Sequence, residues 1–279
     1  MKVTLWGTRG SLASPGPDTV RYGGNTSCIS ISGENSHPII FDAGTGIRLV
    51  GQTISKSTKE IHIFLTHLHM DHLVGFPFFS PLFFSNIIIN IWGPPSSTYK
   101  LESRVHRYLS PPLFPMRVRD IRSTLLFHEM PKDPIEIGEF QIKAEMILHP
   151  NPTIGYRIKS NHSVVTYIPD HEPALGLSSY PRGAEWTSGF ALAEGSDLLI
   201  HDAQYSDDEY RSRFGFGHSS VRQAIQFAKL CNVKELVPFH HDPAHSDDII
   251  DQLIVSAISD QQPKYKVSPG KEGSVFELI

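Results

Sequence analysis

Cysteine is scarce in this sequence, with two residues, Cys28 and Cys231, in a chain of 279. Their spacing is not that of a thiolate metal site, and both stand in segments typical of a protein core. A disulfide framework and a cysteine nucleophile are therefore not supported. We expect two reduced, buried thiols, as in a cytoplasmic protein.

Charge of one sign and uninterrupted apolar runs are also in short supply. The formal net charge is −4, which argues against bulk electrostatic capture of nucleic acid or membrane. A net charge does not exclude a local basic patch. One apolar stretch has the length of a membrane span, but residues 73–92 contain Pro77, Pro81 and two asparagines, which favours a globular core. Val3-Thr4-Leu5-Trp6, directly after Met1-Lys2, resembles a first strand rather than a secretory signal.

The most informative stretch is a short strand followed by a run of metal-type ligands. Residues 61–65 are mainly apolar and rich in β-branched side chains, which predicts a buried strand. His67 and His69 follow with the i, i+2 spacing that turns both rings to one side of an extended chain, and Asp71 and His72 come next, where a helix could start. Burying three imidazoles and a carboxylate in one small volume is costly unless a cation compensates them. The pattern therefore predicts a metal site.

This stretch, Thr66-His67-Leu68-His69-Met70-Asp71-His72, resembles the signature of the metallo-β-lactamase superfamily of hydrolases. The resemblance covers nearly the whole chain apart from an arginine- and proline-rich segment, residues 94–131. It implies an α/β fold, a four-layer αββα sandwich in which two sheets pack face to face and a dinuclear metal site lies at one edge. The alternation of strand-like and helix-like segments, with polar residues at strand ends, agrees with a layered α/β fold.

We expect residues 1–279 to form one domain of this fold, with 94–131 as an insert or lid rather than another core strand. The insert contains five arginines interleaved with apolar side chains: Arg104, Arg107, Arg117, Arg119 and Arg122. It is interpreted either as a solvated face or as a contact surface for the substrate or for a second subunit. A homodimer is therefore left open.

Taken residue by residue, the resemblance implies seven metal ligands in two groups that share one aspartate: His67, His69 and His149; Asp71, His72 and His240; and Asp170 between them. His149 ends a predicted strand, and the segment after it resembles the third-histidine segment of the phosphodiesterase branch; His128 and His162 are weaker rivals. A ligand set without thiolate suits two divalent ions, zinc first, with manganese or iron as alternatives.

The segment Gly217-His218-Ser219-Ser220 resembles the corresponding element of tRNase Z and its phosphodiesterase relatives. In that branch its histidine acts on the leaving oxygen, partnered by an acid in an H-E-A-T element, which His201-Asp202-Ala203-Gln204 matches with Asp for Glu. The resemblance implies attack by hydroxide formed on the metals, with His218 as general acid, Asp202 as its partner and Asp71 as a catalytic ligand. A positioned proton donor contributes roughly 10²–10⁴-fold to such a reaction.

Four further positions are assigned from turns and strand ends. Arg9 and Asn25 stand in glycine-rich turns and are candidates to contact the substrate. Asp42 follows a strand beside two glycines and is expected to orient a ligand or to cap the next helix. His171 could compete for a metal but is expected to be exposed.

The long arm with which tRNase Z grips transfer RNA has no counterpart in this sequence, and the mild acidity argues in the same direction. We therefore expect a small phosphodiester as substrate, such as a cyclic nucleotide, a cyclic phosphate or a short oligonucleotide, and neither a large nucleic acid nor a membrane. Two alternatives stay open: a metal-dependent hydrolase of the lactonase or thioesterase type, and a non-catalytic, metal-stabilised sensor or interaction module.

Overall fold

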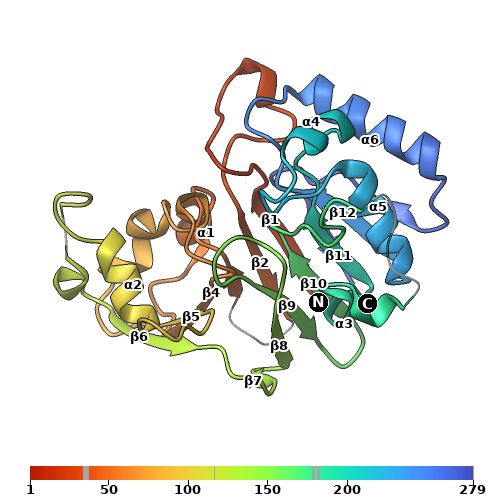
Figure 1. Ribbon diagram of the computed structural model, residues 1–279. Helices are drawn as coiled ribbons and strands as arrows, with labels where there is room; N and C mark the ends of the chain where they lie inside the picture. The colour runs from red at the N-terminus through yellow and green to blue at the C-terminus, as the bar shows by residue number, and fades with distance from the viewer. Residues whose placement is uncertain (34–37, 116, 178–179, 181–182, 279) are drawn as a thin grey trace.

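The computed structural model describes residues 1–33, 38–115, 117–177, 180 and 183–278. Within these residues the chain forms two seven-stranded sheets. The sheets pack face to face, and helices cover their outer surfaces (Figure 1). This αββα arrangement confirms the predicted fold class.

The first sheet has the strand order β14-β1-β2-β3-β4-β5-β6. In chain order its strands are β1 (Lys2–Gly7), β2 (Cys28–Ser32), β3 (Ile39–Phe41), β4 (Glu60–Phe64), β5 (Ile88–Gly93), β6 (Thr124–Glu129) and β14 (Val275–Glu277). The strands from β3 to β6 are mutually parallel. Their carboxyl ends therefore meet at one edge of the sheet.

The second sheet has the order β13-β12-β11-β10-β9-β8-β7. Its strands are β7 (Ile135–Ile137), β8 (Phe140–Met146), β9 (Ile154–Lys159), β10 (Val164–Ile168), β11 (Leu198–Asp202), β12 (Glu235–Phe239) and β13 (Lys266–Val267). The strands from β10 to β13 are parallel, so this sheet too gathers its carboxyl strand ends at one edge.

Alternating side chains of the strands divide the apolar core into three layers. In β11, Leu198 and Ile200 face the core between the two sheets, whereas Leu199 faces the outer helices. The first sheet is covered by α1 (Ile47–Thr53) and α2 (Leu101–Tyr108). The second is covered by α3 (Phe190–Ala193), α5 (Val221–Leu230) and α6 (Asp247–Gln261), with α4 (Asp207–Ser212) nearby (Figure 1).

The structure corrects part of the prediction for residues 94–131. We expected an insert or lid rather than another core strand, but residues 124–129 form β6, which pairs in parallel with β5 at the edge of the first sheet. Its Leu125 and Phe127 have the i, i+2 spacing of a strand with one apolar face, and they pack against the outer core. The helix α2 also buries Leu101 and Val105 there, so this part of the segment is anchored to the sheet.

The two cysteines bear out what the composition indicated. Cys28 and Cys231 are buried free thiols, and burial raises the pKa of both. Among the helices that the structure describes, none combines the length and the apolar character that crossing a bilayer requires.

Candidate metal centre

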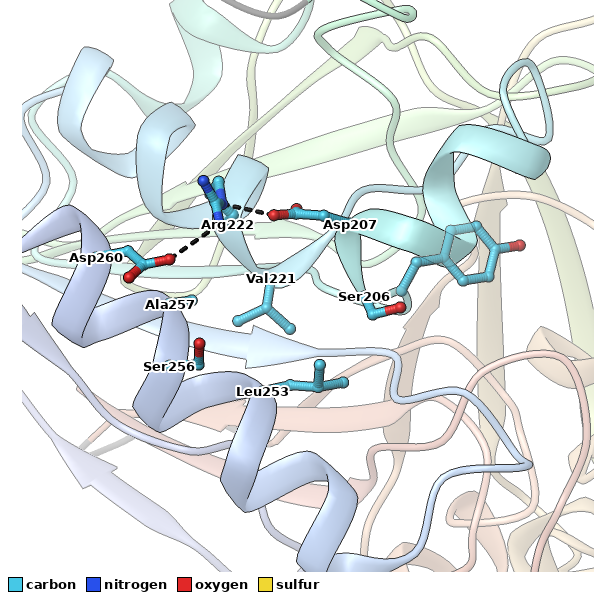
Figure 2. A pocket seen from close by; sticks show the side chains of 9 residues that line it. Ser206, Asp207, Val221, Arg222, Leu253, Ser256, Ala257 and Asp260 are labelled. Carbon is cyan, nitrogen blue, oxygen red and sulfur yellow. Dashed lines mark hydrogen bonds and ion pairs between the residues drawn. The ribbon is translucent and has the colours of Figure 1, made fainter.

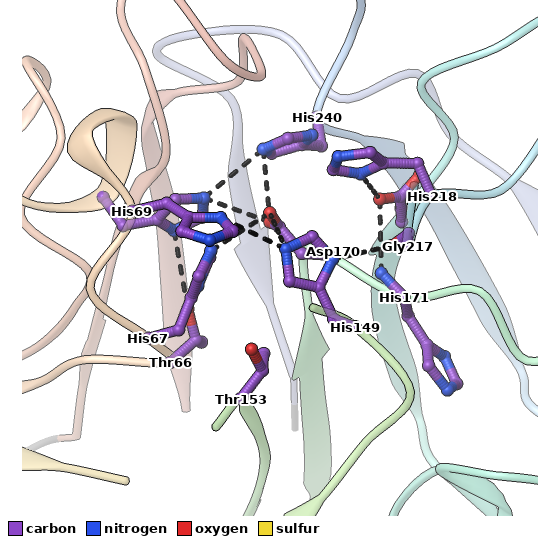
Figure 3. Close-up of polar contacts among 12 residues, drawn as sticks. Thr66, His67, His69, His149, Thr153, Asp170, His171, Gly217, His218 and His240 are labelled. Carbon is purple, nitrogen blue, oxygen red and sulfur yellow. Dashed lines mark hydrogen bonds and ion pairs between the residues drawn. The ribbon is translucent and has the colours of Figure 1, made fainter. Parts of the chain in front are cut away.

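Polar side chains gather where the parallel strands of both sheets end. Asp42 directly follows β3, Asp170 lies just beyond β10, Asp202 is the last residue of β11, and His240 directly follows β12. Because the carboxyl ends of parallel strands meet at one edge, these residues can approach one another from distant parts of the sequence. Figure 3 shows Asp170, His218 and His240 side by side with the histidines that follow β4.

The segment after β4 supplies four side chains to this edge. The backbone is still extended at His69 and then makes a single 3-10 turn, Met70–His72. The sequence had left open a helix that starts near Asp71, but no helix longer than this turn forms there. His67 and His69 consequently turn to one side, and the turn brings Asp71 and His72 against them. Asp71, His67 and His72 are buried, with 7%, 1% and 0% of their surface exposed.

His149 reaches the same place from the loop between β8 and β9. The start of β9, which follows this loop, is joined to the segment after β4 by two hydrogen bonds: Ile154 N–H donates to the Thr66 carbonyl at 2.9 Å, and the Tyr156 hydroxyl donates to the Leu65 carbonyl at 2.7 Å. As a result His149 Nε2 lies 3.3 Å from His69 Nδ1. The weaker rivals lie elsewhere, since His128 bonds to Asn90 in the sheet and His162 is exposed in a turn.

The first cluster that could hold a metal ion consists of His67, His69, His149 and Asp170. His149 Nδ1–H donates to the Gly217 carbonyl at 2.8 Å, which leaves a lone pair on Nε2. Burial lowers the pKa of His149 to about 4 and lowers the pKa of His67 well below its ordinary value. Both rings are therefore neutral near pH 7, as a metal ligand must be.

The second cluster consists of Asp71, His72, Asp170 and His240. His72 Nδ1–H donates to Asp42 at 2.8 Å, and His240 Nδ1–H donates to Gln204 Oε1 at 2.9 Å. Each ring in the neutral tautomer with Nδ1–H presents the lone pair of Nε2 inward. Burial by itself would lower the pKa of His72, but the charges of Asp170, Asp71 and Asp42 outweigh burial and raise it well above its ordinary value, so a cation bound at Nε2 takes the place of a proton. The two Nε2 atoms are 3.3 Å apart, and each lies 3.2 Å from Asp71 Oδ2.

Asp170 belongs to both clusters through different oxygens. Its Oδ2 lies 3.5 Å from His67 Nε2 and 3.7 Å from His149 Nε2, whereas its Oδ1 lies 3.1 Å from His72 Nε2. Burial opposes its charge, but the surrounding imidazoles hold the pKa of Asp170 well below its ordinary range. Its carboxylate is thus an anion set between two groups of nitrogen ligands.

The donor atoms of both clusters fit divalent cations. Asp170 Oδ1 and His67 Nε2 are buried without a hydrogen-bond partner, although buried polar atoms normally have one. The ligand atoms lie 3.1–3.7 Å apart, and this spacing matches the roughly 3.4 Å between ligands on one tetrahedral zinc ion with bonds of about 2.0–2.1 Å. Nitrogen and carboxylate ligands without a thiolate suit zinc, manganese or iron.

A network around Asp42 fixes the ring of His72. The Asp42 carboxylate accepts hydrogen bonds from Thr66 N–H at 2.8 Å and from the Tyr167 hydroxyl at 2.9 Å, besides the bond from His72. Such outer partners set the tautomer and orientation of a ligating histidine. Of the two roles considered for Asp42, orientation is the one that these bonds fit, because α1 begins at Ile47 after Gly46 without a side-chain cap.

Two residues that orient cluster members were missed from the sequence. Gln204 accepts a hydrogen bond from His240, as described. It stands two residues after Asp202, and this position just past a strand end is the signal that could have identified it. Ser11 N–H donates to Asp71 Oδ2 at 2.8 Å. The glycine-rich turn before Ser11 therefore does present an N–H group to an anion, and this anion is a side chain of the protein. A Cβ at Gly10 would lie 2.3 Å from His240 Nδ1, so only glycine fits there.

Glu172 was also missed, although it stands two residues after Asp170. Its buried carboxylate accepts from the Tyr210 hydroxyl at 2.8 Å and from the N–H groups of Gly215 and Gly217 at 3.0 and 2.9 Å. These bonds hold the loop whose Gly217 carbonyl orients His149. Gly217 has a φ of +88°, and a Cβ there would lie 2.4 Å from His149 Nδ1.

His218 lies against both clusters. Its ring stacks on His240 with centroids 5.0 Å apart and meets His149 edge-on at 5.0 Å. His218 Nδ1–H donates to Asp202 Oδ2 at 2.6 Å. Burial by itself would lower the pKa of His218, but the charge of Asp202 and the hydrogen bond to it outweigh burial and raise the pKa. Asp202 is held in turn by the N–H groups of Gln204 and Ser219, at 3.1 and 3.0 Å.

Two expectations about neighbouring residues are wrong. Arg9 was a candidate to meet the substrate, but its side chain is fully buried and donates to the carbonyls of Gly23 and His245 at 2.9 and 2.7 Å. His171 was expected to be exposed, but it is fully buried, 3.0 Å from His201 Nε2, and Figure 3 shows it directed away from the clusters. In both cases the burying segments are distant in sequence.

The substrate role of Asn25 stays a prediction. Its side-chain amide donates to Glu272 Oε2 at 3.0 Å, which ties the glycine-rich turn to the last part of the chain.

Figure 2 shows the residues that line a small crevice between α4, α5 and α6. It encloses about 60 Å³, and no member of either cluster lines it. Arg222 on its wall is already paired with Asp207 and Asp260. The crevice therefore has neither the volume nor the free charge of a substrate site.

The αββα sandwich with clusters of metal-type ligands at the strand ends, among them a third group of Asp202, His218 and His240, defines the class as a metal-dependent hydrolase fold. Residues 37–241, more than half of the chain, match the family model described as "Beta-lactamase superfamily domain". The chain therefore belongs to the β-lactamase superfamily, which confirms the resemblance noted in the sequence. Together with the clusters, this membership makes it a metal-dependent hydrolase.

Two curated relatives are similar to the chain over almost its full length. Ribonuclease Z of Staphylococcus epidermidis is 24% identical, and the match covers 94% of this chain and 95% of that protein. Ribonuclease Z of Haloarcula marismortui is 22% identical, with 90% of each chain covered. The phosphodiesterase branch suggested by the sequence is thus the one in which the relatives fall.

Solved structures show the same fold at low sequence identity. The metallo-β-lactamase fold protein YhfI from Bacillus subtilis has a TM-score of 0.73 at 19% identity, covering 99% of this chain and 98% of its own. Zn²⁺-bound PqqB from Methylobacterium extorquens has a TM-score of 0.71 at 16% identity, and the short form of human tRNase Z has 0.68 at 21%, each with full coverage of both chains.

Proposed function

We propose that the chain is a dinuclear metal-dependent phosphodiesterase that hydrolyses a small phosphodiester. One observation carries the proposal: the buried His218–Asp202 pair adjoins both clusters of metal-type ligands, at ring distances of 5.0 Å from His240 and from His149. A proton donor beside a dinuclear site matters most when the leaving group is a poorly stabilised alkoxide. The two relatives named ribonuclease Z support a phosphodiester as the bond that is cleaved.

In this proposal one divalent ion is bound by His67, His69 and His149 and a second by Asp71, His72 and His240, with Asp170 shared by both. The opposite oxygens of Asp170, which face different clusters, support this division. Two bound ions supply Lewis-acid chemistry, since they lower the pKa of a bound water and neutralise the oxygens of the phosphoryl group. Zinc is proposed first because nitrogen ligands prevail, with manganese or iron as alternatives.

His218 is proposed as the general acid. Its Nδ1–H is held by Asp202, so the proton available for transfer stands on Nε2. No hydrogen bond joins Nε2 to a residue in the described part of the chain, which leaves this atom for the leaving oxygen. Asp202 stabilises the imidazolium form before transfer, and its backbone donors keep the carboxylate in position.

The proposed substrate is small. The net charge of −4 supports this size, because tight binding of a long nucleic acid depends on many cationic contacts to phosphates. Precursor transfer RNA is the natural competitor, given the names of the relatives, and belongs in the same assay.

The test is turnover of bis(p-nitrophenyl) phosphate, cyclic mononucleotides, dinucleotides, precursor transfer RNA and a lactone by protein stripped of metal and reloaded with zinc or manganese. We expect metal-dependent cleavage of small phosphodiesters. Asp71→Ala and His69→Ala should abolish it while the circular dichroism spectrum stays unchanged. Asp208→Ala is the matched control, because that carboxylate is 89% exposed.

Three outcomes would contradict the proposal in different ways. Full turnover by metal-stripped protein would remove the metal centre from the reaction. Faster cleavage of the lactone than of any phosphodiester would show that the preferred substrates are carboxylic esters. A preference for precursor transfer RNA over every small diester would keep the chemistry but reject the small substrate.

A further inference from the structure

We propose that a cationic groove beside His69 binds a second phosphate of the substrate, with Arg107 as the residue that recognises it. The inference rests on the proposed function and names its substrate class: a phosphodiester that carries a further phosphate group. That group is either a terminal phosphate or the next diester linkage of a short oligonucleotide.

The groove encloses about 330 Å³ between the start of the 94–131 segment and the β8–β9 loop. Ser96, Thr98 and Tyr99 line it from the stretch before α2, Arg107 lines it from α2, and Asn151 lines it from the loop. Its volume falls within the range of small-molecule sites, about 300–1,000 Å³. A phosphate with part of its sugar therefore fits.

A single imidazole ring separates the groove from the first cluster. His69 Nδ1 lies 3.3 Å from His149 Nε2 inside the cluster, whereas His69 Nε2 lies 3.2 Å from the side-chain amide of Asn151 on the groove side. His69 is itself part of the groove lining. A substrate with its scissile phosphorus at the cluster can therefore place its next substituent in the groove.

The charge of the groove favours an anion. Two arginines line it, and none of its described lining residues is acidic. Arg104 is already engaged, because its guanidinium donates to the Pro94 carbonyl and lies 3.5 Å from Glu129 Oε1. Arg107 is exposed, and no ion pair joins it to a carboxylate among the described residues. Arg107 is thus the cation that the protein leaves available.

Arg107 is also placed for a phosphate in particular. Its guanidinium carbon lies 5.4 Å from the centre of the Tyr99 ring, a cation–π contact that restrains the flat group. A restrained guanidinium offers two parallel N–H donors, which match two oxygens of one phosphate. The nearby hydroxyls of Ser96 and Thr98 can donate to the remaining oxygens.

The test compares thymidine dinucleotides with and without an extra phosphate on the zinc-loaded enzyme. The substrates are dTpdT, its 5′-phosphorylated form pdTpdT, its 3′-phosphorylated form dTpdTp, and the trinucleotide dTpdTpdT. We expect Arg107→Ala to raise KM roughly tenfold for at least one of the three longer substrates, the equivalent of one charge-assisted hydrogen bond partly screened by solvent. KM for dTpdT and kcat for bis(p-nitrophenyl) phosphate should change by less than about twofold on the same reasoning.

Two further variants make the test specific. Arg107→Lys keeps the charge but loses the paired donors, so its KM should fall between those of the wild type and Arg107→Ala. Arg119→Ala is the matched control: this arginine belongs to the same 94–131 segment, is 71% exposed, and does not line the groove. It should behave as the wild type on every substrate. The substrate that responds distinguishes a terminal phosphate from a neighbouring diester.

An equal effect of Arg107→Ala on dTpdT and on all three longer substrates would overturn the proposal, as would an equal effect of Arg119→Ala. If the wild type cleaves no phosphodiester, the proposed function fails by itself. The groove is then tested by calorimetric titration of thymidine 3′,5′-bisphosphate into zinc-loaded protein. Weaker binding by Arg107→Ala but not by Arg119→Ala would support the groove, and equal binding by all three proteins would refute it.

Discussion

Replacing Asp202 by asparagine is the most direct test of how the proposed proton donor works. The substitution keeps the size of the side chain and leaves one oxygen to accept from the N–H groups of Gln204 and Ser219, at 3.1 and 3.0 Å in the native chain. It removes the charge that holds His218 Nδ1–H at 2.6 Å. Because Asp202 raises the pKa of His218 against the opposing effect of burial, Asp202→Asn lowers the protonated fraction of His218 at neutral pH.

The size of the effect follows from the hydrogen bond that is lost. A buried hydrogen bond to a charged group contributes about 1.5–3 kcal/mol. If that stabilisation applies to the protonated donor in the transition state, the rate falls roughly 10- to 150-fold. The loss should appear in full for dTpdT, whose leaving group is an alkoxide. It should be less than about threefold for bis(p-nitrophenyl) phosphate, whose nitrophenolate leaves without a proton donor.

A double-mutant cycle decides whether the two residues act together. His218→Ala, Asp202→Asn and the double variant are compared by kcat/KM on both substrates, with thermal unfolding as the check on folding. If Asp202 works through His218, the double variant is no slower than His218→Ala alone. Additive losses would mean that Asp202 acts through another group. Equal losses on dTpdT and on the nitrophenyl ester would remove the general-acid role from His218 altogether.

Three further predictions concern the metal sites and the loop that supports them. Chelation should lower the unfolding temperature by at least about 5 °C, because ions at 100 times their Kd add about 2.7 kcal/mol to the stability of the native state. Calorimetry before chelation and after zinc refilling checks this. An unchanged unfolding temperature would contradict metal binding by the two clusters. Glu172→Gln should destabilise the protein by about 1–3 kcal/mol in urea unfolding, whereas Glu102→Gln, at a 56% exposed side chain, should change it by less than about 0.5 kcal/mol. Gly217→Ala should weaken zinc binding about 10- to 100-fold in competition titration, because a Cβ there would lie 2.4 Å from His149 Nδ1. If the variant binds zinc as tightly as the wild type, the loop shifts to accommodate the methyl group and the prediction is wrong.

The ligands that follow β4 could be found from sequence because they follow a local rule, whereas His149, Asp170 and His240 were implied by the family resemblance. His67 and His69 have the two-residue period of an extended chain after a strand. Asp170 and His240 lie within two residues of the ends of apolar strands, and parallel strands bring such positions to one edge. Together with the family resemblance, these rules were sufficient to name all seven side chains that the structure brings together.

The residues that orient the ligands could not be found in this way, because their roles depend on which loops meet. Ser11 reaches Asp71 across 60 positions, and Gln204 reaches His240 across 36. Arg9 shows the opposite error for the same reason. An arginine in a glycine-rich turn resembles a phosphate contact, yet the carbonyl of His245, 236 positions away, accepts its proton at 2.7 Å. A local pattern can indicate that a donor is available, but only the folded chain determines whether the protein itself has already used it. By that criterion we propose Arg107 rather than Arg9 as a substrate contact.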